Sequence, residues 1–178
     1  MQRLFIGLEL PELIMRQLLA MRQNISGARW QTANQLHLTL CFIGNASEET
    51  TRNITAALLT LESPAFDLTL EKPGYFGPQD NPRALWLGVN PESHVAALHD
   101  QVEIRLMQVG IARDERSFTP HVTLARMAKD SGPADAFLQA FREYRSPAFR
   151  VQHISLFRST VTHEGSTYDV VRRFPLEG

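Results

Sequence analysis

The chain has 178 residues, of which 43% are hydrophobic and 21% charged, values that are ordinary for one globular domain with an apolar core. Its 18 basic and 19 acidic residues give a formal net charge of −1, so an anionic partner has to be held by a local patch. The single cysteine, Cys41, excludes a disulfide framework and a multi-cysteine metal site, and without an apolar run of membrane length or a cleavable leader we expect a cytoplasmic protein with no membrane contact.

Apolar periodicity predicts both strands and helices in the first half of the chain. Residues 3–10 alternate as in a half-buried strand, with Phe5 facing away from the apolar row. After Pro11, apolar residues follow at helical spacing until Gly27. The other elements predicted here are short strand 28–31, strand 36–43, a helix at 47–61 capped by Ser47, and strands 65–71 and 84–90.

The second half has the same mixture of elements. We predict a helix at 91–109, a strand at 118–127, a helix at 133–144, and strands 148–159 and 166–174 joined by a turn. Helices mixed with hairpin-length connections favour an α+β fold with largely antiparallel sheets.

One tetrad occurs twice. His37-Leu38-Thr39-Leu40 is matched by His121-Val122-Thr123-Leu124, each within an apolar strand and about half a chain apart. The repeat indicates a two-lobed duplication. If a pseudo-twofold axis relates the lobes, the two imidazoles face each other across a cleft.

The His-x-Thr spacing sets an imidazole and a hydroxyl on one face of each strand, because successive side chains alternate. Two such pairs suit in-line displacement at phosphorus, in which a base activates the nucleophile and an acid protonates the leaving oxygen. Histidine can fill both roles near neutral pH, and the threonine hydroxyls can donate hydrogen bonds to phosphoryl oxygens. This chemistry requires no metal.

The two tetrads resemble those of the 2H phosphoesterases, and within them those of the RNA 2',3'-cyclic phosphodiesterases, also called 2'-5' RNA ligases. Further similarity lies in RLFIGLELPE, ARWQTANQLHLTLCFIG, PRALWLGV and FTPHVTLAR, in this order. The resemblance implies one bilobal domain over residues 1–178, with two largely antiparallel sheets and flanking helices around a central cleft.

The resemblance also implies an activity: hydrolysis of RNA or nucleoside 2',3'-cyclic phosphate to a 2'-phosphate without metal or other cofactor, and reversible 2'-5' RNA ligation without ATP. His37 is then the proton donor and His121 the acceptor, with Thr39 and Thr123 beside them and Arg126 in contact with substrate. The expected partners are RNA ends or nucleotides bearing a 2',3'-cyclic phosphate or a 2'-phosphate, and the expected state is a monomer.

Two substrate contacts raise geometric questions. Arg126 lies five residues after His121, so strict alternation turns it away from the cleft unless the strand ends or twists near Ala125. Phe5 is a candidate for stacking on a nucleobase, with a core role as the alternative.

The remaining histidines and Cys41 receive structural interpretations. His153 fits a relaxed His-x-Ser pattern but lies outside the duplication, and we expect His94 and His99 to be solvated or capping residues of their helix. Cys41 shares the face of His37 by alternation, and we interpret it as a packing residue because zinc would lack ligands.

Two other functions remain open from the sequence. One is a 2H phosphodiesterase for another small cyclic phosphate, such as an ADP-ribose cyclic phosphate. The other is a non-catalytic module that binds RNA ends. The paired histidines speak against the second function, because recognition alone does not need two symmetrically placed titrating groups.

Overall fold

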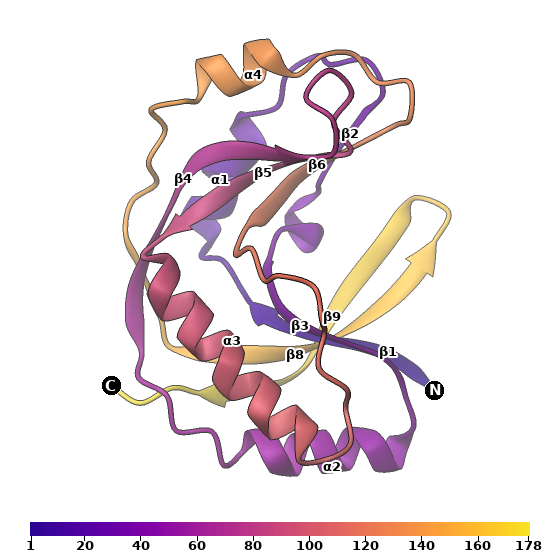
Figure 1. The fold of residues 1–178 in the computed structure, drawn as a ribbon, viewed down its shortest axis with the longest axis vertical. Coiled ribbons are helices and arrows are strands. Elements are labelled where there is room, and N and C mark those ends of the chain that lie inside the picture. Colours follow the sequence, from indigo (N-terminus) through magenta and orange to yellow (C-terminus); the bar gives the residue numbers. More distant parts are fainter.

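Neighbouring strands all run antiparallel in the computed structural model, which describes residues 1–178 (Figure 1). The strands are β1 (Gln2–Leu8), β2 (Ala28–Trp30), β3 (Leu38–Ala46), β4 (Phe66–Phe76), β5 (Ala84–Asn90), β6 (Val122–Met127), β7 (Phe149–Val151), β8 (His153–Thr162) and β9 (Gly165–Pro175). Their order is β7-β4-β5-β6-β3-β1-β8-β9, and β2 pairs with β6.

Four α-helices and one 3-10 helix accompany the sheet: α1 (Glu12–Ala20), η1 (Ala33–Gln35), α2 (Glu48–Leu58), α3 (Glu92–Met107) and α4 (Asp135–Ala140). The predicted cap is present at Ser47, whose hydroxyl accepts from the Thr50 backbone N–H. Helix α1 ends well before Gly27, where polar residues 22–24 interrupt the apolar stripe, and α4 is also shorter than predicted. None of the helices has the length and apolarity to cross a membrane.

The expected α+β mixture and antiparallel pairing are present, but the strands form one curled sheet where we expected two. One part holds β1, β3, β8 and β9, and the other holds β2, β4, β5, β6 and β7. They join between β3 and β6, where Leu38 faces Val122 as the only registered pair. The sheets merge because the strands that carry the tetrads begin side by side.

The two parts share a local plan. Strand β1, helix α1 and strand β3 correspond to β5, α3 and β6, in which a helix connects two adjacent antiparallel strands. His37 directly precedes β3, and His121 directly precedes β6. The core is continuous between them, because both residues of the joining pair are fully buried within one apolar cluster.

Gly7 permits a close approach of the β1 and β3 backbones near this junction. It pairs with Thr39, and a Cβ added to it would lie 2.6 Å from the Leu38 carbonyl oxygen. Backbone atoms of a central strand cannot move away as a flexible side chain can. A side chain at this position would therefore push β1 away from β3.

We expect Gly7→Ala to lower the free energy of unfolding by roughly 1–3 kcal/mol, the usual cost of overpacking a core. Urea denaturation followed by circular dichroism measures this change. Gly132→Ala is the matched control, because the nearest heavy atom to its added Cβ is 3.7 Å away. Equal stability of the two variants would contradict the steric argument.

Candidate active site

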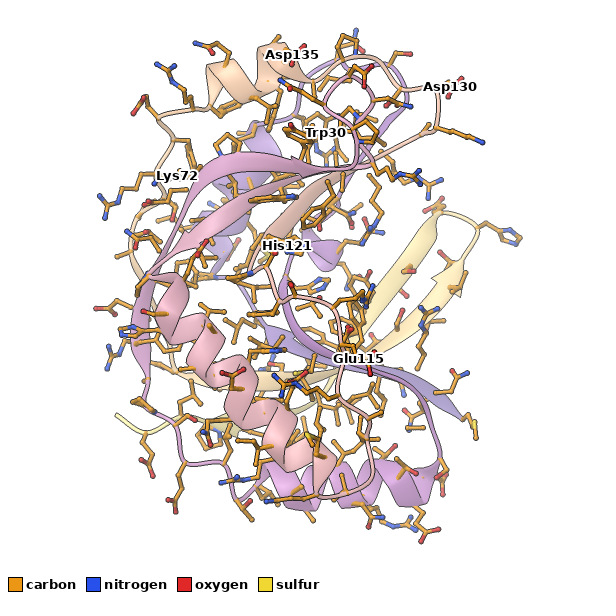
Figure 2. All side chains as sticks on the ribbon, in the orientation of Figure 1. Trp30, Lys72, Glu115, His121, Asp130 and Asp135 are labelled. Carbon is orange, nitrogen blue, oxygen red and sulfur yellow. The ribbon has the colours of Figure 1, made fainter.

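The two tetrads lie side by side in the middle of the molecule, where Figure 2 labels His121. With Leu38 opposite Val122, antiparallel pairing sets His37 opposite Thr123 and Thr39 opposite His121. Leu38 and Val122 are buried in the core, so their tetrad neighbours project from the other face. There they line a cavity of about 590 Å³, together with Arg126.

The His37 ring is fixed at both nitrogens. Nδ1 donates to the Gln35 carbonyl oxygen at 2.7 Å, because a carbonyl can only accept. Nε2, which is then unprotonated in the neutral ring, accepts from the Thr39 hydroxyl at 2.8 Å. The ring centroid lies 4.9 Å from those of Phe5 and Tyr168. The geometry leaves Nε2 as the atom that exchanges a proton with a ligand.

These neighbours change the acidity of His37. Burial against the aromatic rings disfavours the charged imidazolium and is the main reason that the pKa of His37 falls from 6.5 to about 4. The bond to the Gln35 carbonyl opposes this change, while the charges of Arg126 and His121 add to it. The unliganded protein therefore holds His37 neutral at pH 7.

His121 is oriented by the same device. Its Nδ1 donates to the Thr119 carbonyl oxygen at 2.6 Å, again two residues earlier, and Nε2 has no hydrogen-bond partner in the protein. Burial, opposed by this hydrogen bond and supported by the charge of Arg126, lowers the pKa of His121. The tetrad pattern did not reveal either carbonyl, although both occupy the same position relative to their histidine.

A β-bulge at the fourth tetrad residue changes the alternation in both strands. Between β5 and β6, Trp86 pairs with Thr123 and Leu85 with Ala125, so Leu124 is the extra residue. The bulge returns Arg126 to the face of Thr123, which is the irregularity that this arginine required to reach the cleft. The guanidinium makes no hydrogen bond or ion pair within the protein, while Arg126 lines the cavity.

The equivalent bulge in β3 corrects the prediction for Cys41. Gly7 pairs with Thr39 and Ile6 with Cys41, so Leu40 is the extra residue there. Cys41 therefore lies on the opposite face from His37, where it is buried against α3. Its assignment as a packing residue is consistent with this position, but the alternation argument about its face was wrong.

Phe5 does not have the free ring face that base stacking needs. It is 4% exposed, stacks on Phe157 at 4.8 Å and packs against His37. Phe5 also borders the cavity, and its packing against Phe157 and His37 favours the core role that was the alternative to base stacking. Sequence reasoning missed Phe42, which is 60% exposed and lines the same cavity at the position after the bulge that corresponds to Arg126.

Helix η1 connects His37 to the projecting β8–β9 hairpin. Asn34 Nδ2 donates to the Tyr168 carbonyl oxygen at 2.8 Å, and the Tyr168 backbone N–H donates to Asn34 Oδ1 at 2.9 Å. Gln35 Nε2 donates to the Ser166 carbonyl oxygen at 2.8 Å. These bonds hold Tyr168 edge-on against His37, so the hairpin forms one wall of the cavity.

His99 contacts the first tetrad and the segment before the second, contrary to the expected solvated or capping role. It is buried, donates from Nδ1 to the Leu40 carbonyl oxygen at 2.8 Å, and stacks on Phe118 with centroids 3.9 Å apart. Its position on the buried face of α3 explains the difference. His153, by contrast, has the expected structural environment, with Nε2 2.9 Å from a Glu9 carboxylate oxygen.

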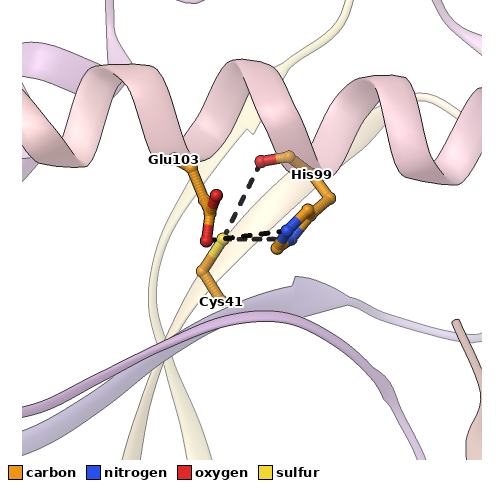
Figure 3. Close-up of side chains that lie close together, drawn as sticks. All are labelled: Cys41, His99 and Glu103. Atoms are coloured by element: carbon orange, nitrogen blue, oxygen red, sulfur yellow. Dashed lines mark hydrogen bonds and ion pairs between the residues drawn. The ribbon is translucent and has the colours of Figure 1, made fainter. Parts of the chain in front are cut away.

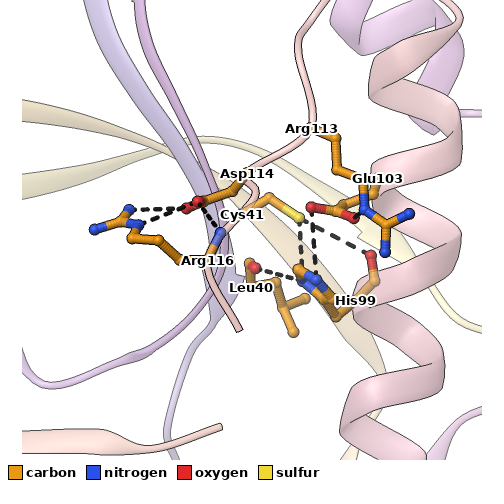
Figure 4. Close-up of polar contacts among 7 residues, drawn as sticks. All are labelled: Leu40, Cys41, His99, Glu103, Arg113, Asp114 and Arg116. Atoms are coloured by element: carbon orange, nitrogen blue, oxygen red, sulfur yellow. Dashed lines mark hydrogen bonds and ion pairs between the residues drawn. The ribbon is translucent and has the colours of Figure 1, made fainter. Parts of the chain in front are cut away.

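Cys41, His99 and Glu103 form the one cluster of potential metal ligands, with ligand atoms within 4.8 Å of one another (Figure 3). Internal partners already engage these groups: His99 Nδ1 donates to Leu40, and Arg113 Nε lies 3.0 Å from a Glu103 oxygen (Figure 4). Cys41 directly follows the bulge residue Leu40. The ion pair between Arg113 and Glu103 attaches the segment that precedes the second tetrad to α3.

Comparison with known proteins gives consistent matches over almost the whole chain. The model of the 2'-5' RNA ligase superfamily matches residues 13–162. An RNA 2',3'-cyclic phosphodiesterase of Archaeoglobus fulgidus is 29% identical, over 97% of this chain and 99% of the relative. One of Thermus thermophilus is 31% identical, over 99% of this chain and 91% of the relative.

Solved structures extend the comparison to the fold. The crystal structure of E. coli LigT complexed with 3'-AMP superposes with a TM-score of 0.80 at 26% identity, covering 99% of both chains. The curled antiparallel sheet with its four α-helices is therefore an arrangement shared with LigT.

We expect His37 to titrate near pH 4 in the ligand-free protein, as measured from its Cε1–H resonance by NMR. Because the folded-state pKa lies below the unfolded value, this histidine destabilises the fold as pH falls from about 6.5 to 4. Arg126→Gln removes a repelling charge and should raise the pKa. Arg16→Gln, on exposed α1, is the control, and an equal shift in both variants would contradict a local effect.

We expect His99→Phe to reduce the free energy of unfolding by about 1–3 kcal/mol, because the ring can still stack on Phe118 but the Leu40 carbonyl loses its donor. Thermal or urea unfolding provides the measurement. His94→Phe, an exposed position on the same helix, should have little effect. Unchanged stability of His99→Phe would show that the bond to Leu40 contributes little.

Proposed function

The chain belongs to the 2'-5' RNA ligase superfamily, and we propose that it hydrolyses the 2',3'-cyclic phosphate of an RNA end or nucleoside to a 2'-phosphate. One observation carries the proposal: two imidazoles and two threonines from paired strands line a single cavity. Arg3, Arg116 and Arg126 also line it, whereas no carboxylate does. Such a cavity favours an anion that reacts by proton transfer.

The proposed reaction divides the proton transfers between the two Nε2 atoms. Nε2 of His121, which has no partner in the protein, takes a proton from water as the water oxygen attacks phosphorus. The bond from phosphorus to O3' breaks, and protonated His37 gives its Nε2 proton to that oxygen. The product carries a 2'-phosphate, and the two histidines have exchanged protonation states.

Hydrogen-bond donors and a positive charge are available to stabilise the negative charge that builds up on the phosphoryl oxygens. Thr39, whose hydroxyl contacts His37, and Thr123 both line the cavity, and Arg126 contributes a full positive charge. These groups can balance the single charge of a phosphodiester, so the proposed reaction uses no metal. In ligation a ribose hydroxyl replaces water, and no ATP is needed because one phosphodiester bond is exchanged for another.

Substrate binding has to charge His37 before it can act as the acid. The low pKa of His37 leaves its protonated form scarce in the free protein at neutral pH. A phosphodiester anion in the cavity counters the charge of Arg126, and this favours the His37 imidazolium. The substrate itself thus promotes the protonation state that its cleavage requires.

The proposed domain is a single bilobal unit over residues 1–178 with an internal duplication. Support comes from the shared strand–helix–strand plan, from the pairing of second tetrad residues with each other, and from the matching bulges at Leu40 and Leu124. Phe42, with its exposed ring at the cavity wall, replaces Phe5 as the proposed stacking surface for a nucleobase.

We expect His37→Ala and His121→Ala to abolish turnover of adenosine 2',3'-cyclic phosphate, assayed with a chelator by chromatography of the 2'-phosphate. Thr39→Ala or Thr123→Ala should reduce kcat roughly 10²-fold to 10³-fold, the usual effect of losing one oxyanion donor. His153→Ala is the matched control and should retain activity, since its partner is Glu9. Turnover by either tetrad histidine variant at the wild-type rate would refute the proposal.

A further inference from the structure

Two arginines face each other next to the reaction centre without an acidic partner. Arg29 on β2 pairs directly with Arg126 on β6, so both side chains leave the same face of the sheet. Like charges at directly opposed positions destabilise a sheet. Neither guanidinium makes an ion pair with a carboxylate of the chain, although 19 acidic residues are available. Both side chains are exposed, so the two guanidinium groups are open to an anionic ligand.

The Arg29 guanidinium lies close to residues that line the cavity. Its Nη1 atom is 3.6 Å from the point that a Cβ on Gly165 would occupy, and Gln35 Nε2 is 3.3 Å from the same point. Gln35 and Ser166 line the cavity, and Gly165 begins the hairpin strand β9. Arg29 therefore reaches across from β2 to the hairpin wall, one strand further from the tetrads than Arg126.

We propose that Arg29 binds the phosphodiester that precedes the reacting nucleotide in an RNA strand. The inference rests on the proposed function, in which Arg126 serves the reacting phosphate. Adjacent strands lie about 4.8 Å apart, so Arg29 offers a second guanidinium that starts one strand away from that of Arg126. The planar donor fork of arginine matches the non-bridging oxygens of a phosphate.

The overall charge supports a local contact of this kind. At a net charge of −1 the protein exerts no general attraction on RNA, so affinity for a strand has to come from individual phosphate contacts. A mononucleotide has no preceding phosphodiester and cannot use Arg29. The structure therefore assigns the enzyme a preference for an oligonucleotide end.

The test compares kcat/KM for adenosine 2',3'-cyclic phosphate with that for the dinucleotide ApA ending in a 2',3'-cyclic phosphate. We expect Arg29→Gln to reduce kcat/KM for the dinucleotide about 10-fold, the effect of losing one charge-assisted contact, and to leave the mononucleotide nearly unchanged. Arg29→Lys should lie between, because it keeps the charge without the fork. The salt dependence of dinucleotide binding should lose about 0.7 from its log–log slope.

Arg52→Gln on exposed α2 is the matched control, since it removes the same charge from a side chain without partners. An equal loss in Arg52→Gln and Arg29→Gln, an equal loss on both substrates, or no loss on either would overturn the role of Arg29. Failure of the wild-type protein to hydrolyse either substrate would instead overturn the proposed function, and this inference with it.

Discussion

The pairing of Leu38 with Val122 is the contact on which the candidate site depends. It is the single registered pair between β3 and β6, and it is fully buried. Because both residues occupy the second position of their tetrads, antiparallel pairing at this point sets each histidine opposite the threonine of the other tetrad. A shift by one residue would turn the imidazoles to opposite faces, since the side-chain period is two. The apolar core therefore fixes the geometry of the polar site.

The sequence predicted the residues of the site better than their directions. The tetrads, the alternating strands and most element positions followed from periodicity, which depends on residue type alone. The bulges at Leu40 and Leu124 did not, because an extra residue in a ladder depends on the partner strand, and both bulges follow a perfectly alternating sequence. For the same reason alternation gave the wrong face for Cys41 and raised a difficulty for Arg126. The roles of Phe5 and His99 depended on contacts with distant segments, which no local pattern records.

Burial and charge act together in the cavity. Aromatic packing removes water from His37, and Arg126, which has no carboxylate partner, adds positive potential. Both influences favour neutral imidazoles in the unliganded protein. An anion in this cavity opposes the second influence and leaves the first in place, so the charge state of the histidines depends on whether the cavity holds one. The hydrogen bonds from Nδ1 to Gln35 and Thr119 keep the ring orientations constant through this change.

The amide side chains of Asn34 and Gln35 form hydrogen bonds with the β8–β9 hairpin only through its main chain. Peptide groups are the same whatever side chain they carry, so this attachment does not depend on the identity of Ser166 or of the residues around it. Substitutions in the hairpin can thus alter which chemical groups border the cavity, while the hairpin keeps its position. Such a wall is suited to evolve new selectivity without disturbing the imidazole that it shelters.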